Sequence, residues 1–188
     1  MRQGWTGGYA DMAVYNIVQS NVPRRNGGAI ESVEVHQSGV EFETEHAFAN
    51  GLQLSGGFMY IFDVEAFRAD GSSANGNVFF GSNGVSVPET QILLRAQYNL
   101  TNEWLVWGMG YFNSGYVSSN SDGTTTKRSD HYRFDVGAAW RPRDDLAIRF
   151  RVENLLDEKD FGQTVEGQPT ADADKIGRVF WVGLDYSF

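Results

Sequence analysis

The side chains that could perform chemistry are few in this chain, and they are scattered. Cysteine is absent, so the sequence offers neither a thiolate nucleophile nor a disulfide. The three histidines are His36, His46 and His131, and their spacing is not that of metal ligands. A hydrolytic Ser–His pair would need a serine on a strand next to the imidazole, and none is evident for His46. The sequence therefore predicts no enzyme, no metal site and no cofactor.

Acidic residues gather in one polar segment near the end of the chain: Asp157, Glu158, Asp160, Glu166, Asp172 and Asp174. Their carboxylates could contact a ligand or Ca²⁺, but a calcium site needs oxygens that converge from loop-spaced positions. A solvated loop accounts for the same composition, and this is the interpretation we prefer. The net charge of −9 argues against a basic face, so we expect no nucleic-acid partner.

Most of the chain alternates between apolar and polar residues with a period of two, which is typical of half-exposed β-strands. In one segment Ile148 and Phe150 share a face, whereas Arg149 and Arg151 share the other. This segment is 146–153, and the same alternation recurs at 40–48, 52–65, 91–98, 105–112, 131–140 and 177–188, and more weakly from Tyr9 to Val18. We therefore expect an all-β protein of about eight strands.

Short and long connections alternate between these segments. The short ones lie at 49–51, 101–103 and 142–144, and Asn50-Gly51 is a strong hairpin signal. The long, polar ones span roughly 19–30, 67–88, 117–129 and 157–176. Outer-membrane barrels have this topology, with short periplasmic turns and long extracellular loops. Since no run approaches the roughly 18–20 apolar residues of a membrane helix, we predict a transmembrane antiparallel up-and-down β-barrel.

The two faces of these strands differ in charge. The polar face carries Glu41, Glu43, Glu45, Asp63, Glu65, Arg95, Arg133, Asp135, Arg149, Arg151, Glu153 and Asp185. The apolar face carries almost no charge apart from Arg178, which lies at the loop end of its strand. A charged Arg or Lys at the bilayer midplane costs about 2–4 kcal/mol, so we expect the apolar face to meet lipid.

Aromatic residues support the same orientation. The apolar face holds Trp107, Trp140, Tyr60, Tyr98, Tyr111, Tyr132 and Tyr186. In a soluble barrel or sandwich with this face inward, each buried Tyr and Trp would need a polar partner. Beside the short turns we expect one interfacial girdle, formed by Phe48, Tyr98, Trp140, Tyr186 and Phe188.

Four stretches resemble the C-terminal strands of TonB-dependent receptors. They are Arg151-Val-Glu-Asn-Leu-Leu-Asp-Glu-Lys-Asp-Phe161, Gly177-Arg-Val-Phe-Trp-Val-Gly-Leu-Asp-Tyr-Ser-Phe188, Ser38-Gly-Val-Glu-Phe-Glu43 and Ala13-Val-Tyr-Asn-Ile-Val-Gln-Ser-Asn-Val22. They occur in the order of the family. The motif residues carried over are Asn154, Leu155, Leu156, Asp157, Gly177 and Arg178.

The resemblance implies a role in energy-coupled import across the outer membrane of a Gram-negative bacterium. Such receptors are plugged barrels of about 22 strands, so residues 1–188 would be the last eight strands, without the plug. The implied partners are membrane lipid, a ferric siderophore or similar scarce ligand, and the TonB system, contacted through missing N-terminal parts. The barrel-assembly machinery would read Tyr186 and Phe188 as an assembly signal.

The alternative is a self-contained eight-stranded outer-membrane barrel with a structural or small-porin role. Closure would pair the weakly alternating Tyr9 to Val18 segment with the last strand, and that segment lacks the pattern that fixes a register. A narrow lumen would also have to hold an excess of carboxylates over guanidinium groups. We therefore expect the strands to form part of a larger wall.

Overall fold

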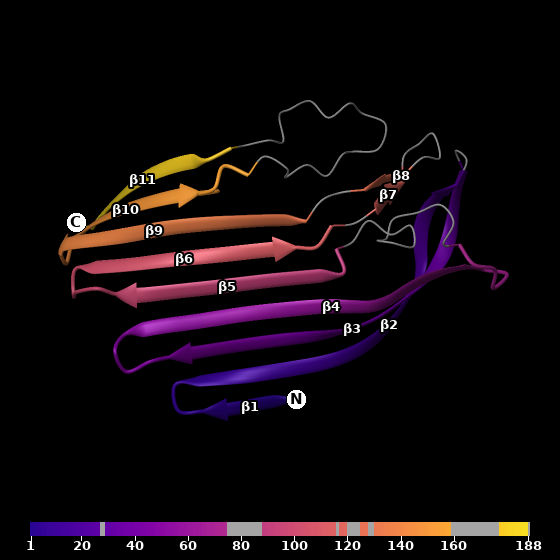
Figure 1. Ribbon diagram of the computed structural model, residues 1–188, viewed down its shortest axis with the longest axis horizontal. Coiled ribbons are helices and arrows are strands. Elements are labelled where there is room, and N and C mark those ends of the chain that lie inside the picture. Colours follow the sequence, from indigo (N-terminus) through magenta and orange to yellow (C-terminus); the bar gives the residue numbers. More distant parts are fainter. Residues whose placement is uncertain are drawn as a thin grey trace.

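Nine antiparallel strands of the described residues form one continuous sheet, in which each strand pairs with the next strand of that sheet along the chain (Figure 1). The computed structural model describes residues 1–26, 29–74, 88–115, 117–119, 125–127, 130–158 and 177–187. Among these residues no helix is long and apolar enough to cross a membrane. The sheet is open, because β1 (Arg2–Trp5) and β11 (Val179–Tyr186) form its two edges and do not pair with each other. The all-β fold and the open wall agree with the sequence prediction.

The strands of the main sheet are β1 (Arg2–Trp5), β2 (Gly8–Asn26), β3 (Ala29–Ala47), β4 (Leu52–Arg68), β5 (Thr90–Asn99), β6 (Trp104–Asn113), β9 (His131–Arg143), β10 (Leu146–Glu153) and β11 (Val179–Tyr186). A separate two-stranded hairpin is formed by β7 (Val117–Ser119) and β8 (Thr125–Lys127). It lies within the segment 117–129 that we expected to be a loop.

The short turns gather at one end of the sheet, together with the C-terminal end of β11 (Figure 1). They join β1 to β2, β3 to β4, β5 to β6 and β9 to β10. Gly7 and Gly51 adopt φ values of +86° and +87° in two of these turns, a region that glycine enters without steric cost. The predicted tight turns at 49–51 and 101–103 are confirmed, whereas the turn predicted at 142–144 lies at 144–145, because β9 continues to Arg143.

The strand count differs from the prediction, because β1 is an additional strand. It has only four residues, which is too short for alternation to be recognised. Arg2 to Trp5 pair with Asp11 to Gly8 through the Gly7 turn. The indole Nε1 of Trp5 also donates a 2.8 Å hydrogen bond to Nδ1 of His46 on β3, which fixes this edge.

The predicted loop at 19–30 is wrong. Strands β2 and β3 have 19 residues each and stay paired as far as Asn26 and Ala29. A register shift between Gln19 and Val22, with Asn21 at φ +60°, hides the alternation. The polar side chains do not prevent strand pairing, because the backbone groups satisfy one another across the hairpin.

Beyond this shift the hairpin has a small core of its own. Val33, Val35, Ala66 and Ala74 are buried against one another, and Val22 packs against them. A strand of 19 residues is roughly 63 Å long at 3.3 Å per residue, about twice the thickness of the hydrocarbon layer. The far ends of β2, β3 and β4 must therefore stand outside the membrane.

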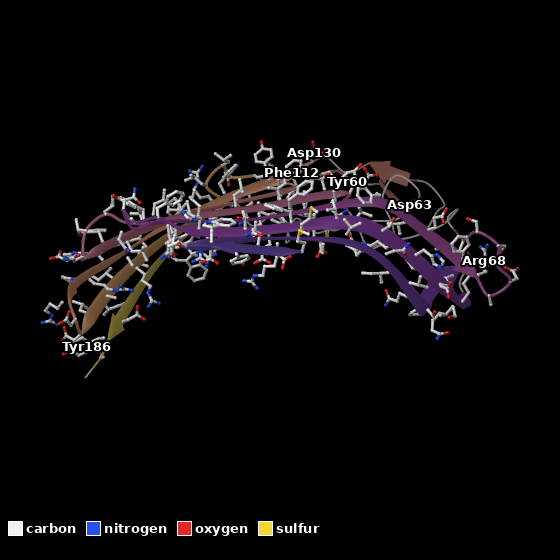
Figure 2. The ribbon with its side chains drawn as sticks, turned by 90° about the horizontal axis from the view of Figure 1, so that it is seen from below. Tyr60, Asp63, Arg68, Phe112, Asp130 and Tyr186 are labelled. Carbon is white, nitrogen blue, oxygen red and sulfur yellow. The ribbon has the colours of Figure 1, made fainter. Side chains whose placement is uncertain are left out.

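Seen from the side, the sheet is an arch with a convex and a concave face, and Tyr60 and Phe112 lie on the convex face (Figure 2). Near the short turns Trp104 stacks on Trp140 with ring centroids 5.7 Å apart. Toward the other end Tyr132 lies beside Phe134, and Tyr60 lies beside Phe62. The sequence predicted one aromatic girdle, and the convex face has two aromatic bands. Phe188, assigned to the predicted girdle, lies outside the described residues.

The two bands mark the height of the lipid-facing surface. Trp140 and Tyr132 both lie on β9, eight positions apart, which is roughly 26 Å along the strand and roughly 20 Å in height at a strand tilt of about 40°. The apolar band of an outer-membrane barrel is about 25 Å tall. The convex face therefore has the dimensions of a membrane-spanning wall.

Strand β6 faces the opposite way from the prediction. We assigned Trp107 and Tyr111 to the lipid face, but they pair with Gly137 and Arg133 of β9 on the concave face. The convex positions of β6 are Trp104, Val106, Gly108, Gly110 and Phe112. Both faces of β6 are apolar, so its own alternation could not decide the orientation. The pairing with β5 and β9 decides it.

Strand β4 reverses its faces part-way. Ile61 pairs with Gly39 and Asp63 pairs with Ser38, so Phe62 is an extra residue in a β-bulge. As a result Asp63 lies on the convex face (Figure 2), and so does Glu65, opposite His36. The sequence prediction that placed both carboxylates with Glu41 on the inner face is wrong, because the bulge shifts the parity.

Candidate functional site

Charged side chains on the concave face divide into two walls. The acidic wall lies on β2 and β3 and consists of Asp11, Glu41, Glu43 and Glu45. Arg2 from β1 lies over the ring of Tyr9 at the edge of this wall, 4.2 Å from the ring centroid. The arginine wall lies on β5, β9 and β10 and consists of Arg95, Arg133, Arg141, Arg149 and Arg151. The concave face therefore has a charge gradient across it.

The buried carboxylate of Asp135 binds two arginines at the end of the arginine wall that is farther from the short turns. Asp135 is only 1% exposed, and its oxygens accept hydrogen bonds from Arg133 at 2.7 and 2.8 Å and from Arg151 at 3.3 Å. Glu153 accepts from Arg133 at 3.0 Å and lies 3.2 Å from Nη1 of Arg151. Two guanidinium groups and two carboxylates thus form one network, in which the buried charge is fully compensated.

The indole ring of Trp107 lies across Gly137, two positions closer to the short turns than Asp135 on β9. A side chain at Gly137 would collide with the ring of Trp107, so the ring lies flat over this position. The guanidinium carbon of Arg151 lies 5.8 Å from the same ring, within the range of a cation–π contact. Glycine at 137 is therefore required for the close approach of Trp107 to the sheet.

Two hollows, each of about 620 Å³, open on the concave face. One lies on the arginine wall and is lined by Arg95, Trp107, Arg149, Arg151 and Trp181, among others. The other lies beside the acidic wall, and its lining includes Tyr9, Asp11, Glu41, Glu43 and Tyr111. The first hollow combines aromatic surface with arginines and Glu153, and the second combines aromatic surface with carboxylates. Neither contains a nucleophile–base pair.

The Asn-Leu-Leu-Asp motif forms a turn directly after β10. The side chain of Asn154 donates to the carbonyl oxygen of Glu158 at 2.7 Å and accepts from the backbone N–H of Glu158 at 2.9 Å. Its own backbone N–H donates to Asp135 at 2.8 Å, and the residue is 2% exposed. Asn154 has φ +53°, a conformation that asparagine tolerates better than most residues.

The Gly-Arg motif joins this turn to β11. The backbone N–H of Arg178 donates to Oδ1 of Asp157 at 2.8 Å. A Cβ at Gly177 would lie 2.5 Å from the same oxygen, so only glycine leaves room for it. Residues 154–158 and 177–178, here called the loop clasp, therefore hold together the two ends of the segment between β10 and β11. Leu155 and Leu156 of the motif are exposed.

The remaining predicted residues are dispersed. Tyr186 pairs with Leu146 at the turn end of β11, and Phe188 lies outside the described residues. Of the acidic segment, Asp157 and Glu158 belong to the loop clasp, and the residues from Asp160 onward lie outside the described part of the chain.

The three histidines lie in separate places. His36 hydrogen bonds to Glu34 at 2.7 Å, and this bond, together with one from Ser20, lowers the pKa of the Glu34 carboxyl. His46 packs edge-on against Phe48, and His131 packs edge-on against Tyr111. In the described ranges, His, Asp and Glu side chains form no group of three or more that could hold a metal ion.

The comparison with protein families identifies the architecture. The family model described as TonB dependent receptor-like, beta-barrel, matches residues 2–155, which is most of the chain. The chain belongs to the TonB-dependent receptors. Members of this family reside in the outer membrane of Gram-negative bacteria, and the family is one of receptors and transporters. No curated protein matches the chain.

Solved structures of TonB-dependent receptors have the same fold. The ferric-catecholate import receptor Fiu from Escherichia coli K12 matches with a TM-score of 0.70 and 17% identity, over 97% of this chain and 25% of that chain. The FrpB iron transporter from Neisseria meningitidis matches with a TM-score of 0.72 and 13% identity, over 100% and 29%. The pyoverdine outer membrane receptor FpvA from Pseudomonas aeruginosa PAO1 matches with a TM-score of 0.69 and 15% identity, over 96% and 27%. The chain thus spans between a quarter and three tenths of the length of these receptors.

Sequence reasoning missed several residues of the concave face. Asp11 and Arg2 were missed because the first strands alternate poorly, and their pairing with β3 and β2 reveals them. Arg141 follows Ala139 with the same parity and could have been found by extending β9 to its turn. Trp107 was missed because its strand has no polar face. Asn154 was recognised only as a motif residue, whereas its contact with Asp135 depends on the fold.

Proposed function

We propose that residues 1–188 form the C-terminal part of the barrel of a TonB-dependent receptor that imports a scarce ligand, such as a ferric siderophore. The observation that carries the proposal is the family match over residues 2–155, and the open nine-stranded arch with a charged concave face supports it. The similar structures include a siderophore receptor, an iron transporter and a copper transporter, which favours a metal or its chelate as cargo.

The proposed partners follow from this architecture. Lipid meets the convex face, the TonB system supplies energy through a part of the receptor outside this chain, and the ligand enters from the side of the long connections. A plug domain would occupy the space beneath the concave face. In this arrangement the charged concave surface faces a hydrated lumen and is not buried in a dry protein core.

Deletion of the gene from its host tests the import function. We expect the deletion strain to grow less under iron limitation than the parent when a siderophore is the only iron source, and to take up less ⁵⁵Fe from that siderophore. Restoring the gene should restore uptake, and removing the proton-motive force should abolish it. Equal uptake by deletion strain and parent across a panel of ferric siderophores would refute the import of ferric siderophores.

We further propose that Tyr186 and Phe188 act as the signal read by the barrel-assembly machinery. Tyr186 lies at the turn end of β11, the edge strand of the sheet, and this position supports the proposal. Deletion of Phe188 from the complete receptor should lower the amount of folded protein in the outer membrane, with ligand affinity per folded receptor unchanged. Unaltered assembly kinetics would exclude this role.

A further inference from the structure

The arginine wall has a regular vertical order. Strand pairing places Arg133 level with Leu93, Arg95 level with Asp135, Arg151 level with Gly137, and Arg149 level with Ala139. Arg141 follows at the short-turn end of β9. The concave face therefore presents a guanidinium group at each of five successive levels, with about 7 Å between levels along the strands.

This series extends across most of the membrane. Arg133 and Arg141 lie on the same strand, eight positions apart, which is roughly 26 Å along β9. With the strand tilt usual in such barrels, about 40°, the vertical span is roughly 20 Å of an apolar band about 25 Å tall. The series thus begins near the band that holds Tyr132 and ends beside the band that holds Trp140.

The guanidinium groups are partly available to a ligand. Within the described residues, Arg95 and Arg141 have no ion-pair partner. Arg149 is bound to Asp185 at 3.0 Å, but both side chains are more than half exposed on the concave face. Only Arg133 and Arg151 are engaged by the buried Asp135. Positive charge that the carboxylates of the wall do not neutralise therefore lies at two levels, those of Arg95 and Arg141.

The opposite charge lies on the acidic wall. Its carboxylates, for example Glu41 and Glu43, face the same lumen from β3. An anion inside the lumen is repelled from that side and attracted to the arginine side, and low-dielectric walls focus such a field. The acidic wall therefore confines an anion to the strands β5 to β11.

We propose that the arginine wall is the path along which an anionic metal chelate crosses the lumen toward the periplasm. The inference rests on the proposed import function and adds the charge of the cargo and the route that it takes. A series of guanidinium groups along the wall suits transport, because a ligand must be able to leave each site as readily as it enters. Trp107 and Trp181 line the hollow on this path and offer flat surfaces to the ligand groups of a chelate.

The decisive variant removes the two unpaired charges, Arg95→Gln together with Arg141→Gln, in the complete receptor in its native outer membrane. The matched charge-retaining variant is Arg95→Lys with Arg141→Lys. Arg143→Gln serves as a control for the loss of a surface arginine, since Arg143 pairs with Asp145 at 3.1 Å beside a short turn. The probes are ⁵⁵Fe complexes of citrate, of a tris-catecholate and of a neutral trihydroxamate. Binding to cells without proton-motive force and energy-dependent uptake are measured separately.

We expect uptake of the anionic chelates to fall at least about threefold in the Gln double variant, with surface binding and the amount of folded receptor unchanged. The Lys double variant and Arg143→Gln should retain uptake. Import of anionic chelates that is insensitive to the Gln substitutions would overturn the path and leave the import function intact. Import of the neutral chelate alone would also overturn it. If the receptor imports none of the three probes, both the path and the import of ferric chelates are wrong.

Discussion

The first and the last strands of the sheet are stabilised in different ways where they leave the membrane. Strands β2, β3 and β4 have 19, 19 and 17 residues, whereas β10 and β11 have 8 each. The long strands continue past the membrane and bury a small apolar core of their own. The short strands end early, and the loop clasp joins them. A strand that leaves the membrane thus needs either new packing or a fixed turn, and this sheet contains both.

The two regions also differ in how they hold negative charge. On the acidic wall Glu43 is exposed and accepts a hydrogen bond from Tyr9. On the arginine wall Asp135 is buried and accepts from two arginines and from the backbone of Asn154. The first carboxylate is exposed to solvent, and the second is part of the fold. Substitutions should therefore have very different consequences on the two walls.

The largest effect is expected from Asp135→Ala. The substitution removes a carboxylate partner of the partly buried Arg133 and Arg151, which keep Glu153, and it removes the Asp135 oxygen that accepts from the Asn154 N–H. Breaking a buried ion-pair network costs about 3–5 kcal/mol. The measurement is the free energy of unfolding of the complete receptor in detergent. Glu43→Ala on the acidic wall should change it by less than about 0.5 kcal/mol. Equal losses would remove the distinction between the walls.

A somewhat smaller effect is expected from placing a charged side chain on the convex face of β10. Phe150 is 43% exposed on the convex face, so Phe150→Arg places a charge against lipid at a cost of about 2–4 kcal/mol. Arg149→Phe changes a lumen position and should be tolerated. Folded receptor is quantified in outer-membrane fractions. Similar yields of the two variants would contradict the assignment of the lipid face.

The loop clasp is tested by Asn154→Ala. This variant loses both side-chain hydrogen bonds to Glu158 and places alanine at φ +53°, for a combined cost of about 2–3 kcal/mol. Amide hydrogen exchange at Leu155 and Glu158 should accelerate, while exchange in β2 and β3 stays unchanged. Asn154→Gly separates the two causes, because glycine relieves the backbone strain but not the lost bonds. Unchanged exchange at Glu158 in both variants would show that the clasp does not stabilise the turn.

The smallest effect concerns the outer end of the β2–β3 hairpin. Hydrogen bonds from His36 and Ser20 hold the pKa of Glu34 below its ordinary value of 4.5. A carboxyl with a lowered folded-state pKa contributes stability above its ordinary pKa, and this contribution is lost as the pH falls through the folded-state value. Proteolytic resistance of the hairpin should therefore decline slightly below pH 4.5 in the parent, and Glu34→Gln should lack this decline.

Local patterns were enough to predict much of this molecule. The alternation in β5, β9, β10 and β11 identified their faces, and Asn50-Gly51 identified a turn, because both signals involve residues close in sequence. The motif residues Asn154, Asp157, Gly177 and Arg178 were found by resemblance. Their function as a clasp was not predicted, since the segment from 159 to 176 separates the residues that meet.

What the sequence determined by itself is therefore the class of the fold, the lipid-exposed character of one face and the end of the sheet at which the short turns lie. Tertiary structure alone decided the orientation of Trp107, the reversal of Asp63, the pairing of Arg2 with Asp11 and the division of the lumen into two charged walls. The physical reason is the range of the interactions. Alternation acts along one strand, whereas register and bulges are set by hydrogen bonds to neighbouring strands, and a shift of one residue moves every following side chain to the other face.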